Sequence, residues 1–266
     1  MRIRELKYSA TNTYLIDSEK VRIVFDTGWA GTYLSFCRAL KEQGCAVRDI
    51  GYVMISHFHP DHCGIAADIA KEGAKILIAD VQRDFIHSAD AVFEKDKKVP
   101  FTPIEDKMLK ILPLKDSRAF LKGLGIGGEI IHTPGHSDDS ISLWLDSGEL
   151  FVGDLNPLYE LELHKGTQTG DSWDKLLALD PAVVYYGHAK TAQLKKIPEP
   201  GPETAEDKEE LVGFIMKLID KGYTLDKIRK KTGADAVFIE DVTRMYLTHP
   251  GVSVQGILDR IEIKGR

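Results

Sequence analysis

Three imidazoles and a carboxylate lie within six consecutive residues of this chain, in the run HFHPDH at residues 57–62. Imidazole nitrogen and carboxylate oxygen are the ligands that suit zinc, iron and manganese. The apolar run at residues 52–55 predicts a strand whose end carries this cluster to the edge of a sheet. Pro60 stiffens the turn, so the side chains can converge rather than alternate. The pattern therefore predicts a metal site rather than a solvated polar loop.

Four more candidate residues stand at the ends of other predicted strands: Asp26, His136, Asp154 and His188. A strand that ends in a polar residue is common, so each position alone is weak evidence. Their recurrence beside a four-ligand cluster indicates one shared site. Asp26, which Thr27 and Gly28 follow, would either cap a turn or orient a metal-bound histidine from behind.

The order of predicted elements before residue 190 is strands first, then strands and helices in turn. Strands are expected at residues 3–8, 13–17 and 21–25, with an antiparallel start because a short turn joins the last two. Helices are expected over 32–43, 64–72, 81–99 and 172–179. Asp171 would cap the last of these helices.

The character of the chain changes after residue 196. Residues 197–202 contain three prolines and predict a linker. The linker would separate a domain of residues 1–196 from a mainly helical C-terminal domain of residues 203–266. Helices are expected over 203–221 and 224–231, and a closing strand over 260–264.

The segment 223–233 resembles half of a helix-turn-helix and carries a group of basic side chains. These are Lys227, Arg229, Lys230 and Lys231. They are candidates for substrate or nucleic-acid contact, and the alternative is a solvated helix face. The net charge of −6 over 266 residues argues against bulk affinity for nucleic acid.

Composition narrows the class of protein further. No apolar run approaches the ~18 residues that a membrane-spanning helix needs, and the first residues have no signal-peptide apolar region. The three cysteines show no metal-type spacing. We therefore expect a cytoplasmic protein that acts on a small-molecule substrate and not at a membrane, with a homodimer left open.

The ordered motifs resemble those of the metallo-β-lactamase-fold hydrolase superfamily. They are HFHPDH at 57–62, TPGHS at 133–137, GD at 153–154 and GH at 187–188, together with DTG at 26–28. The resemblance covers residues 1 to about 190. Within the superfamily, the sequence is similar to the dinuclear branch that contains glyoxalase II and lactonases. It implies an α/β fold, a four-layer αββα sandwich, with the site at the edge where the two sheets meet. A helical extension would follow at the C-terminus.

The resemblance also implies a ligand set. One metal ion would be held by His57, His59 and His136, and a second by Asp61, His62 and His188, with Asp154 bridging the two. Two divalent ions, zinc first and iron or manganese as alternatives, would share a bridging hydroxide that attacks the substrate. Asp61 would orient this hydroxide, and Asp26 would support a ligand from behind. No protein nucleophile is needed, although Cys63 lies beside the cluster.

Three functions follow as alternatives. The first is hydrolysis of a carboxylic ester, lactone or thioester; the second is an iron-dependent dioxygenase of the persulfide type; the third is a nucleic-acid phosphodiesterase. Antibiotic hydrolysis is disfavoured, because true β-lactamases usually replace a ligand of the cluster or use a later cysteine. Candidate substrate contacts are Tyr159, His164, Tyr185 and Tyr186.

Overall fold

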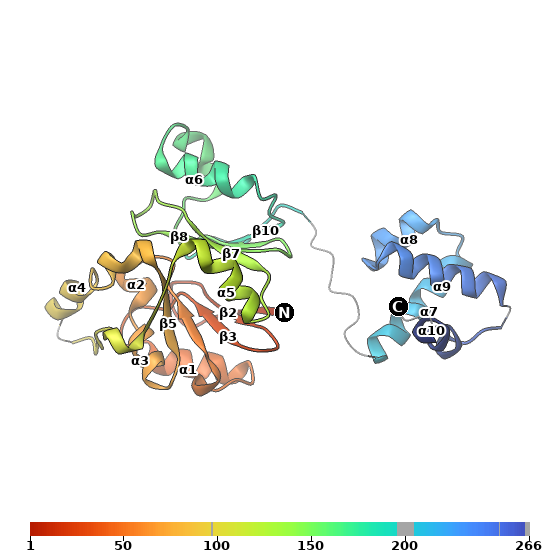
Figure 1. Ribbon diagram of the computed structural model, residues 1–266, viewed down its shortest axis with the longest axis horizontal. Coiled ribbons are helices and arrows are strands. Elements are labelled where there is room, and N and C mark those ends of the chain that lie inside the picture. Colours follow the sequence, from red (N-terminus) through yellow and green to blue (C-terminus); the bar gives the residue numbers. More distant parts are fainter. Residues whose placement is uncertain (97, 196–204, 250, 264–266) are drawn as a thin grey trace. The chain divides into compact units, whose positions relative to one another are not determined.

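The computed structural model describes residues 1–96, 98–195, 205–249 and 251–263. The chain divides into two compact units, Met1–Lys196 and Ile197–Arg266 (Figure 1). The linker predicted over 197–202 lies outside the described residues. Among the described residues, no helix combines the length and the apolar character needed to cross a membrane.

The first unit contains two sheets, and each is built from one continuous stretch of chain. The first sheet has six strands in sequence order. These are β1 (Arg2–Leu6), β2 (Thr13–Asp17), β3 (Arg22–Phe25), β4 (Tyr52–Met54), β5 (Lys75–Ala79) and β6 (Leu109–Leu112). The pairs β1–β2 and β2–β3 are antiparallel, which confirms the predicted antiparallel start. From β3 to β6 every neighbouring pair is parallel.

The second sheet has five strands in the order β11-β10-β9-β8-β7. They are β7 (Gly128–His132), β8 (Ile141–Leu145), β9 (Glu149–Phe151), β10 (Val183–Tyr185) and β11 (Ala192–Gln193). β9 and β10 are parallel, whereas the other neighbours are antiparallel. The chain segments that follow β9 and β10 therefore leave the sheet at the same edge.

The two sheets pack face to face through one apolar core. Phe25 of the first sheet lies against Phe151 of the second, with 5.3 Å between ring centroids, and both side chains are almost fully buried. The outer face of the first sheet packs with α1 (Tyr33–Glu42) and α3 (Ala66–Lys71), and that of the second with α6 (Gln168–Leu177). These four layers, visible in Figure 1, confirm the αββα class.

The helix expected over 64–72 is observed as α3, and a separate short helix, α2 (Pro60–Cys63), precedes it, so the ligand cluster already contains a helical turn. Two other predicted helices of this unit differ from the observed ones. The span 81–99 contains a 3₁₀ segment at Asp80–Phe85 and the short α4 (Asp90–Lys95). α6 begins before residue 172, because the side chain of Thr167, and not Asp171, accepts the capping bond from the Gly170 N–H. The remaining helix, α5 (Ser117–Gly123), lies beside β7.

The described residues of the second unit form four helices with their own core. They are α7 (Ala205–Asp220), α8 (Leu225–Thr232), α9 (Ala236–Thr248) and α10 (Val254–Ile263). The strand predicted over 260–264 is wrong for the described residues 260–263, which belong to α10. Ile257 and Ile261 are four residues apart and both buried, so one helix face enters the core. The alternation in a five-residue window concealed this longer period.

Strand direction explains how distant ligands meet. The carboxyl ends of β3 and β4 lie together because these strands are parallel, and Asp26 and the cluster 57–62 follow them directly. In the second sheet, Asp154 and His188 follow the parallel pair β9 and β10. Ligands at strand ends of two packed sheets converge on one rim of the sandwich.

Candidate metal centre

The seven predicted ligands converge in three overlapping groups. In each group the candidate donor atoms lie within 4.8 Å of one another. The groups are His57, His59 and His136; His57, His62 and Asp154; and Asp61, His62 and His188. The two outer groups have the composition that the family resemblance implied for the two metal ions, and the middle group connects them.

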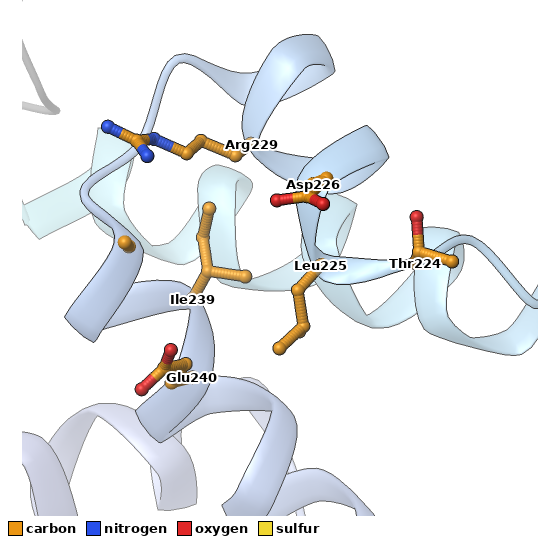
Figure 2. Close-up of a pocket in the computed structure, with 7 residues that line it drawn as sticks. Thr224, Leu225, Asp226, Arg229, Ile239 and Glu240 are labelled. Atoms are coloured by element: carbon orange, nitrogen blue, oxygen red, sulfur yellow. The ribbon is translucent and has the colours of Figure 1, made fainter.

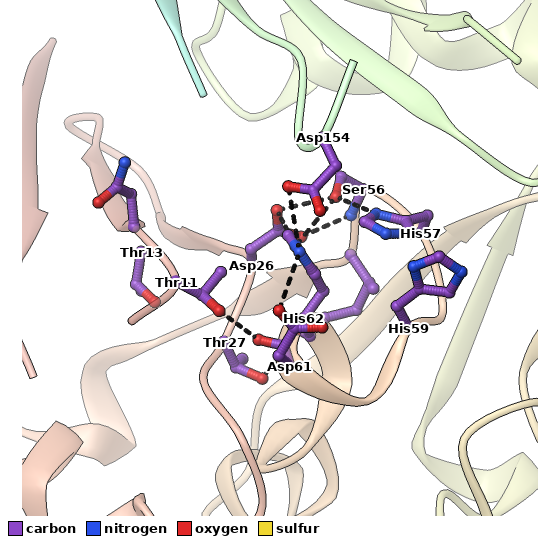
Figure 3. A network of polar contacts seen from close by, with 12 residues as sticks. Thr11, Thr13, Asp26, Thr27, Ser56, His57, His59, Asp61, His62 and Asp154 are labelled. Atoms are coloured by element: carbon purple, nitrogen blue, oxygen red, sulfur yellow. Dashed lines mark hydrogen bonds and ion pairs between the residues drawn. The ribbon is translucent and has the colours of Figure 1, made fainter. Parts of the chain in front are cut away.

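Asp154 lies between the two outer groups. Its Oδ1 is 3.3 Å from His62 Nε2, and its Oδ2 is 3.6 Å from His136 Nε2 and 3.5 Å from His188 Nε2. Figure 3 shows this side chain pointing from its loop toward the buried side of the HFHPDH loop. One carboxylate therefore faces donor atoms of both groups, as a bridging ligand must.

Unpaired buried atoms test whether this centre suits a cation. Among the described residues, His57 Nε2, His62 Nε2 and Asp154 Oδ1 are buried and have no hydrogen-bond partner. Leaving a buried polar atom unpaired costs about 1–3 kcal/mol. Three such atoms belong to one group within ligand distance of each other, so the donor set fits a divalent metal ion.

The buried half of the centre is held in place by Asp26. Its Oδ1 accepts a hydrogen bond from the Ser56 N–H at 2.7 Å, and its Oδ2 accepts one from the Ser56 hydroxyl at 2.8 Å. Oδ2 also lies 2.9 Å from His62 Nδ1 (Figure 3). With Nδ1 engaged by a carboxylate, His62 presents Nε2 to the centre, as metal-bound histidines usually do.

The backbone of Asp26 is unusual, with φ of 57°. This left-handed region is sparsely populated by residues other than glycine, and aspartate tolerates it better than most. The bend follows β3 directly and is tied by the hydrogen bond from the Asp26 N–H to the Met54 carbonyl of β4, at 2.9 Å. In this backbone conformation, the Asp26 carboxylate contacts both Ser56 and His62.

A second buried carboxylate joins the two sheets at the centre. Asp139 is 2% exposed, and its Oδ2 accepts a 2.7 Å hydrogen bond from the N–H of Phe58, which separates His57 from His59. Asp139 belongs to the loop between β7 and β8, three residues after His136. It therefore connects the backbone of the cluster to the loop that brings the third histidine of the same group.

Backbone carbonyls of the centre are held by two side-chain amides. The Gln82 side chain is fully buried and donates to the carbonyls of Ile55 and Ser56, at 2.9 and 3.3 Å. On the opposite side, Asn12 donates to the carbonyls of Tyr186 and Ala189, at 2.9 and 3.0 Å, around the turn with His188. Neither amide lies within a ligand motif.

Two glycines allow the second sheet to approach the cluster. A Cβ at Gly187 would lie 2.4 Å from Asp154 Oδ1 and 2.7 Å from the His62 ring. A Cβ at Gly153 would lie 2.4 Å from the Ser56 hydroxyl, and the φ of this glycine is 55°. The glycines of the GD and GH motifs are therefore needed for close approach.

The electrostatics favour neutral imidazole on one side and ionised carboxylate on the other. Burial and the surrounding imidazoles hold the pKa of His57 well below its usual range, and burial lowers the pKa of His136. A hydrogen bond from His188, 2.9 Å away, outweighs burial and lowers the pKa of Asp61 to about 2. Unprotonated ligands of both kinds are the forms that bind metal.

His62 and Cys63 differ in what they could contribute. Burial disfavours a charged His62 ring, but Asp26 and Asp154 outweigh it and raise its pKa, so a metal ion at Nε2 would displace a proton. Burial raises the pKa of the Cys63 thiol, which is 3% exposed and packs in the core. This thiol does not have the exposure of a nucleophile.

A cleft of about 300 Å³ opens beside the centre. Its lining residues include the candidate ligands His136, Asp154 and His188, together with Tyr159 and Tyr186. Tyr185 points the other way, into the core between the sheets, with its ring stacked 4.7 Å from that of Phe151. His164 is not among the lining residues. Of the four predicted substrate contacts, two thus remain candidates.

The second unit has a separate surface pocket of about 370 Å³ between α8 and α9 (Figure 2). Its lining has both charge signs, with Asp226 and Glu240 beside Arg229. The basic side chains of α8 noted in the sequence are exposed. All three candidate metal groups found among the described residues lie in the first unit.

The sequence was compared with known protein families and structures. The family model described as the metallo-beta-lactamase superfamily matches residues 7–188. This chain belongs to the metallo-β-lactamase superfamily. It is 28% identical over 192 residues to a beta-lactamase-like protein 2 homolog of Drosophila melanogaster, covering 69% of this chain and 60% of that protein. It is 26% identical over 190 residues to a thioesterase of Emericella nidulans, covering 69% and 47%.

Solved structures of the superfamily share the fold. A metallo-beta-lactamase family protein from Thermus thermophilus matches with a TM-score of 0.54 and 20% identity, covering 82% of this chain and 83% of that one. A protein crystallised in a di-iron-bound form, TTHA1623, also has a TM-score of 0.54 at 20% identity, covering 73% and 95%. The chain spans about half to three fifths of the length of the two curated relatives named above.

Proposed function

We propose that this superfamily hydrolase cleaves a carboxylic ester, lactone or thioester with two divalent metal ions held by the seven converging ligands. The observation that carries the proposal is the position of Asp154 between the two groups, together with the unpaired buried atoms around it. Divalent ions bound there would supply Lewis acidity, which polarises a carbonyl oxygen and makes water a nucleophile at neutral pH.

The protein's own groups would position the reactants. His57 and His62 are buried, whereas His59, His136 and His188 are exposed, so the centre is open on one side only. Asp61, 33% exposed, has a carboxylate that stays ionised at neutral pH and can accept a hydrogen bond from an attacking water. The cleft lined by His136 and His188 offers room for the substrate, and the Asp61 carboxylate lies 2.9 Å from His188 Nε2.

Two comparisons support the choice of bond. A relative at 26% identity is named a thioesterase, and another, 24% identical over 149 residues, is an ACP thioesterase of Claviceps purpurea. Zinc is the metal we expect first. Iron is a second candidate, because histidine and carboxylate ligands serve both metals.

Elemental analysis and a substrate panel test the proposal together. The full chain, prepared without chelator and with added zinc, manganese or iron, is expected to hold close to two ions per chain. It should hydrolyse at least one member of a panel of thioesters, lactones and oxyesters, and lose this activity on chelation. One ion or none under metal-replete conditions would contradict the dinuclear assignment. Oxygen consumption with a persulfide, without hydrolysis, would favour the dioxygenase.

A further inference from the structure

The part of the cleft lining that does not belong to the candidate metal ligands is a mostly apolar wall. Besides the ligands and Gly153, the lining consists of Leu155, Pro157, Tyr159, Tyr186 and Ala189. Leu155 and Tyr186 are 2% and 3% exposed, and both belong to the apolar cluster around Trp173. This wall is therefore backed by the core of the second sheet rather than by solvent.

Tyr159 is the unusual member of this wall. Its side chain is 81% exposed although it lines the cleft, and among the described residues its hydroxyl has no hydrogen-bond partner. It lies in the rim segment, defined as the 3₁₀ stretch Leu158–His164. The Leu158 N–H donates to the Tyr186 hydroxyl at 3.3 Å, which fixes the start of this segment against the strand that leads to His188.

The two acidic side chains of the rim segment already have partners. Glu160 accepts a hydrogen bond from the Asn156 side chain, and Glu162 forms an ion pair with Lys165. No lysine or arginine is among the residues that line the cleft; Lys190, next to Ala189, is exposed outside it. An anionic group placed on this wall would thus lose water without gaining a lysine or arginine partner from the lining.

We propose that this wall receives an uncharged, apolar group flanking the scissile carbonyl, and that it discriminates against substrates with a carboxylate or phosphate there. The inference rests on the proposed hydrolase function and specifies its substrate class. Tyr159 supplies the free aromatic face for this contact, and Tyr186 positions it. An exposed ring can be replaced without loss of packing, so its contribution to selectivity is separable from folding.

Matched thioesters measure this selectivity on the metal-loaded full chain. One series keeps N-acetylcysteamine as the thiol and varies the acyl group between phenylacetyl and succinyl. The other keeps acetyl and varies the thiol between benzyl mercaptan and 3-mercaptopropionate. At least one series is expected to favour the apolar member by about tenfold in kcat/KM. Calorimetric binding of the corresponding non-hydrolysable amides should show the same order.

Variants at the rim assign the preference to the wall. Tyr159→Ala should remove most of the tenfold preference, Tyr159→Phe should retain it, and Tyr159→Lys should shift the ratio toward the anionic member. Leu163→Ala is the matched control, because Leu163 is 80% exposed on the same segment but does not line the cleft. It should leave the ratio unchanged.

The outcomes separate the two proposals. If thioesters are hydrolysed without preference in either series, or the anionic members react faster, the inference is wrong while the hydrolase function stands. If no thioester, lactone or oxyester is hydrolysed but the apolar amides bind more tightly and Tyr159→Ala abolishes this, the wall is supported and the hydrolase proposal fails. An unchanged ratio in Tyr159→Ala overturns the role of Tyr159.

Discussion

The metal centre and the rim segment lie side by side but are held in different ways. In the centre, Asp26 fixes the His62 ring, and Asp139 and Gln82 fix the backbone of the loop that carries the cluster. The side chains of these four residues are buried. In the rim segment, Tyr159 and Leu163 are largely exposed, and Glu162 pairs with the nearby Lys165. Hydrogen bonds that fix side chains and backbone are thus concentrated in the candidate metal centre and sparse in the rim segment.

Under the proposed function, this difference would separate the residues that support the chemistry from those that set substrate selectivity. Substitutions in the hydrogen-bonded region should change metal binding and stability together, because each side chain holds several others. Substitutions in the rim should alter the choice of substrate alone. The following changes test this contrast within and beyond the centre.

The largest effect is expected at Asp154. Asp154→Ala removes a carboxylate that faces donor atoms of both groups, so it should lower kcat/KM at least 100-fold and reduce the metal content below two ions per chain. Asp26 contacts one ligand, His62, from behind. Asp26→Ala should therefore weaken metal affinity by about 10–100-fold. Dialysis against graded chelator with elemental analysis compares the two variants. Equal losses of metal in the two variants would contradict the assignment of Asp154 as the ligand shared by both metal ions.

A smaller effect is expected at Asp139, with its neighbour as a matched control. Asp139→Ala leaves the buried Phe58 N–H unpaired, so the free energy of unfolding should fall by about 1–3 kcal/mol. Metal affinity should fall with it, because His57 and His59 flank this N–H. Asp138 is exposed, and Asp138→Ala should leave both quantities unchanged. Denaturant unfolding and metal titration measure them, and equal behaviour of the two variants would contradict the role of Asp139.

The smallest effect on metal content is expected from removing the second unit. All buried residues of its core cluster lie between residues 212 and 261, so its loss should not open the core of the first unit. The chain cut after residue 200 should keep its metal ions, while its KM or preference across the substrate panel changes. Metal loss on truncation would place part of the centre's support in the second unit. An unchanged substrate profile would show that this unit has no part in substrate access.

Much of the centre was accessible from the sequence because its ligands are chemically conspicuous and end apolar runs. Asp154 and His188 could be named without knowing that β9 and β10 are parallel. The supporting residues could not, since Asn12 and Gln82 lie far along the chain from the carbonyls they bind and have no local signal. Asp139 had one weak signal, its position three residues after a ligand.

Local sequence patterns also predicted one wrong element type and left the direction of two side chains undecided. Contacts over a longer stretch of chain decide both. The window 260–264 alternates like a strand, but Ile257 and Ile261 define the face of a helix that is visible only over ten residues. Tyr185 and Tyr186 were equivalent in the sequence. The structure separates them, because Tyr185 packs between the sheets while Tyr186 faces the cleft.

Each sheet is one continuous stretch of chain, and this has a consequence for biosynthesis. The first sheet needs only residues 2–112, so it can form on the ribosome before residues 128–193 of the second are translated. Until then its inner face, with Tyr14 and Phe25, has no partner sheet to cover it. The ligand set is complete only when His188 emerges. Metal loading should therefore be a late event that reports the closure of the sandwich.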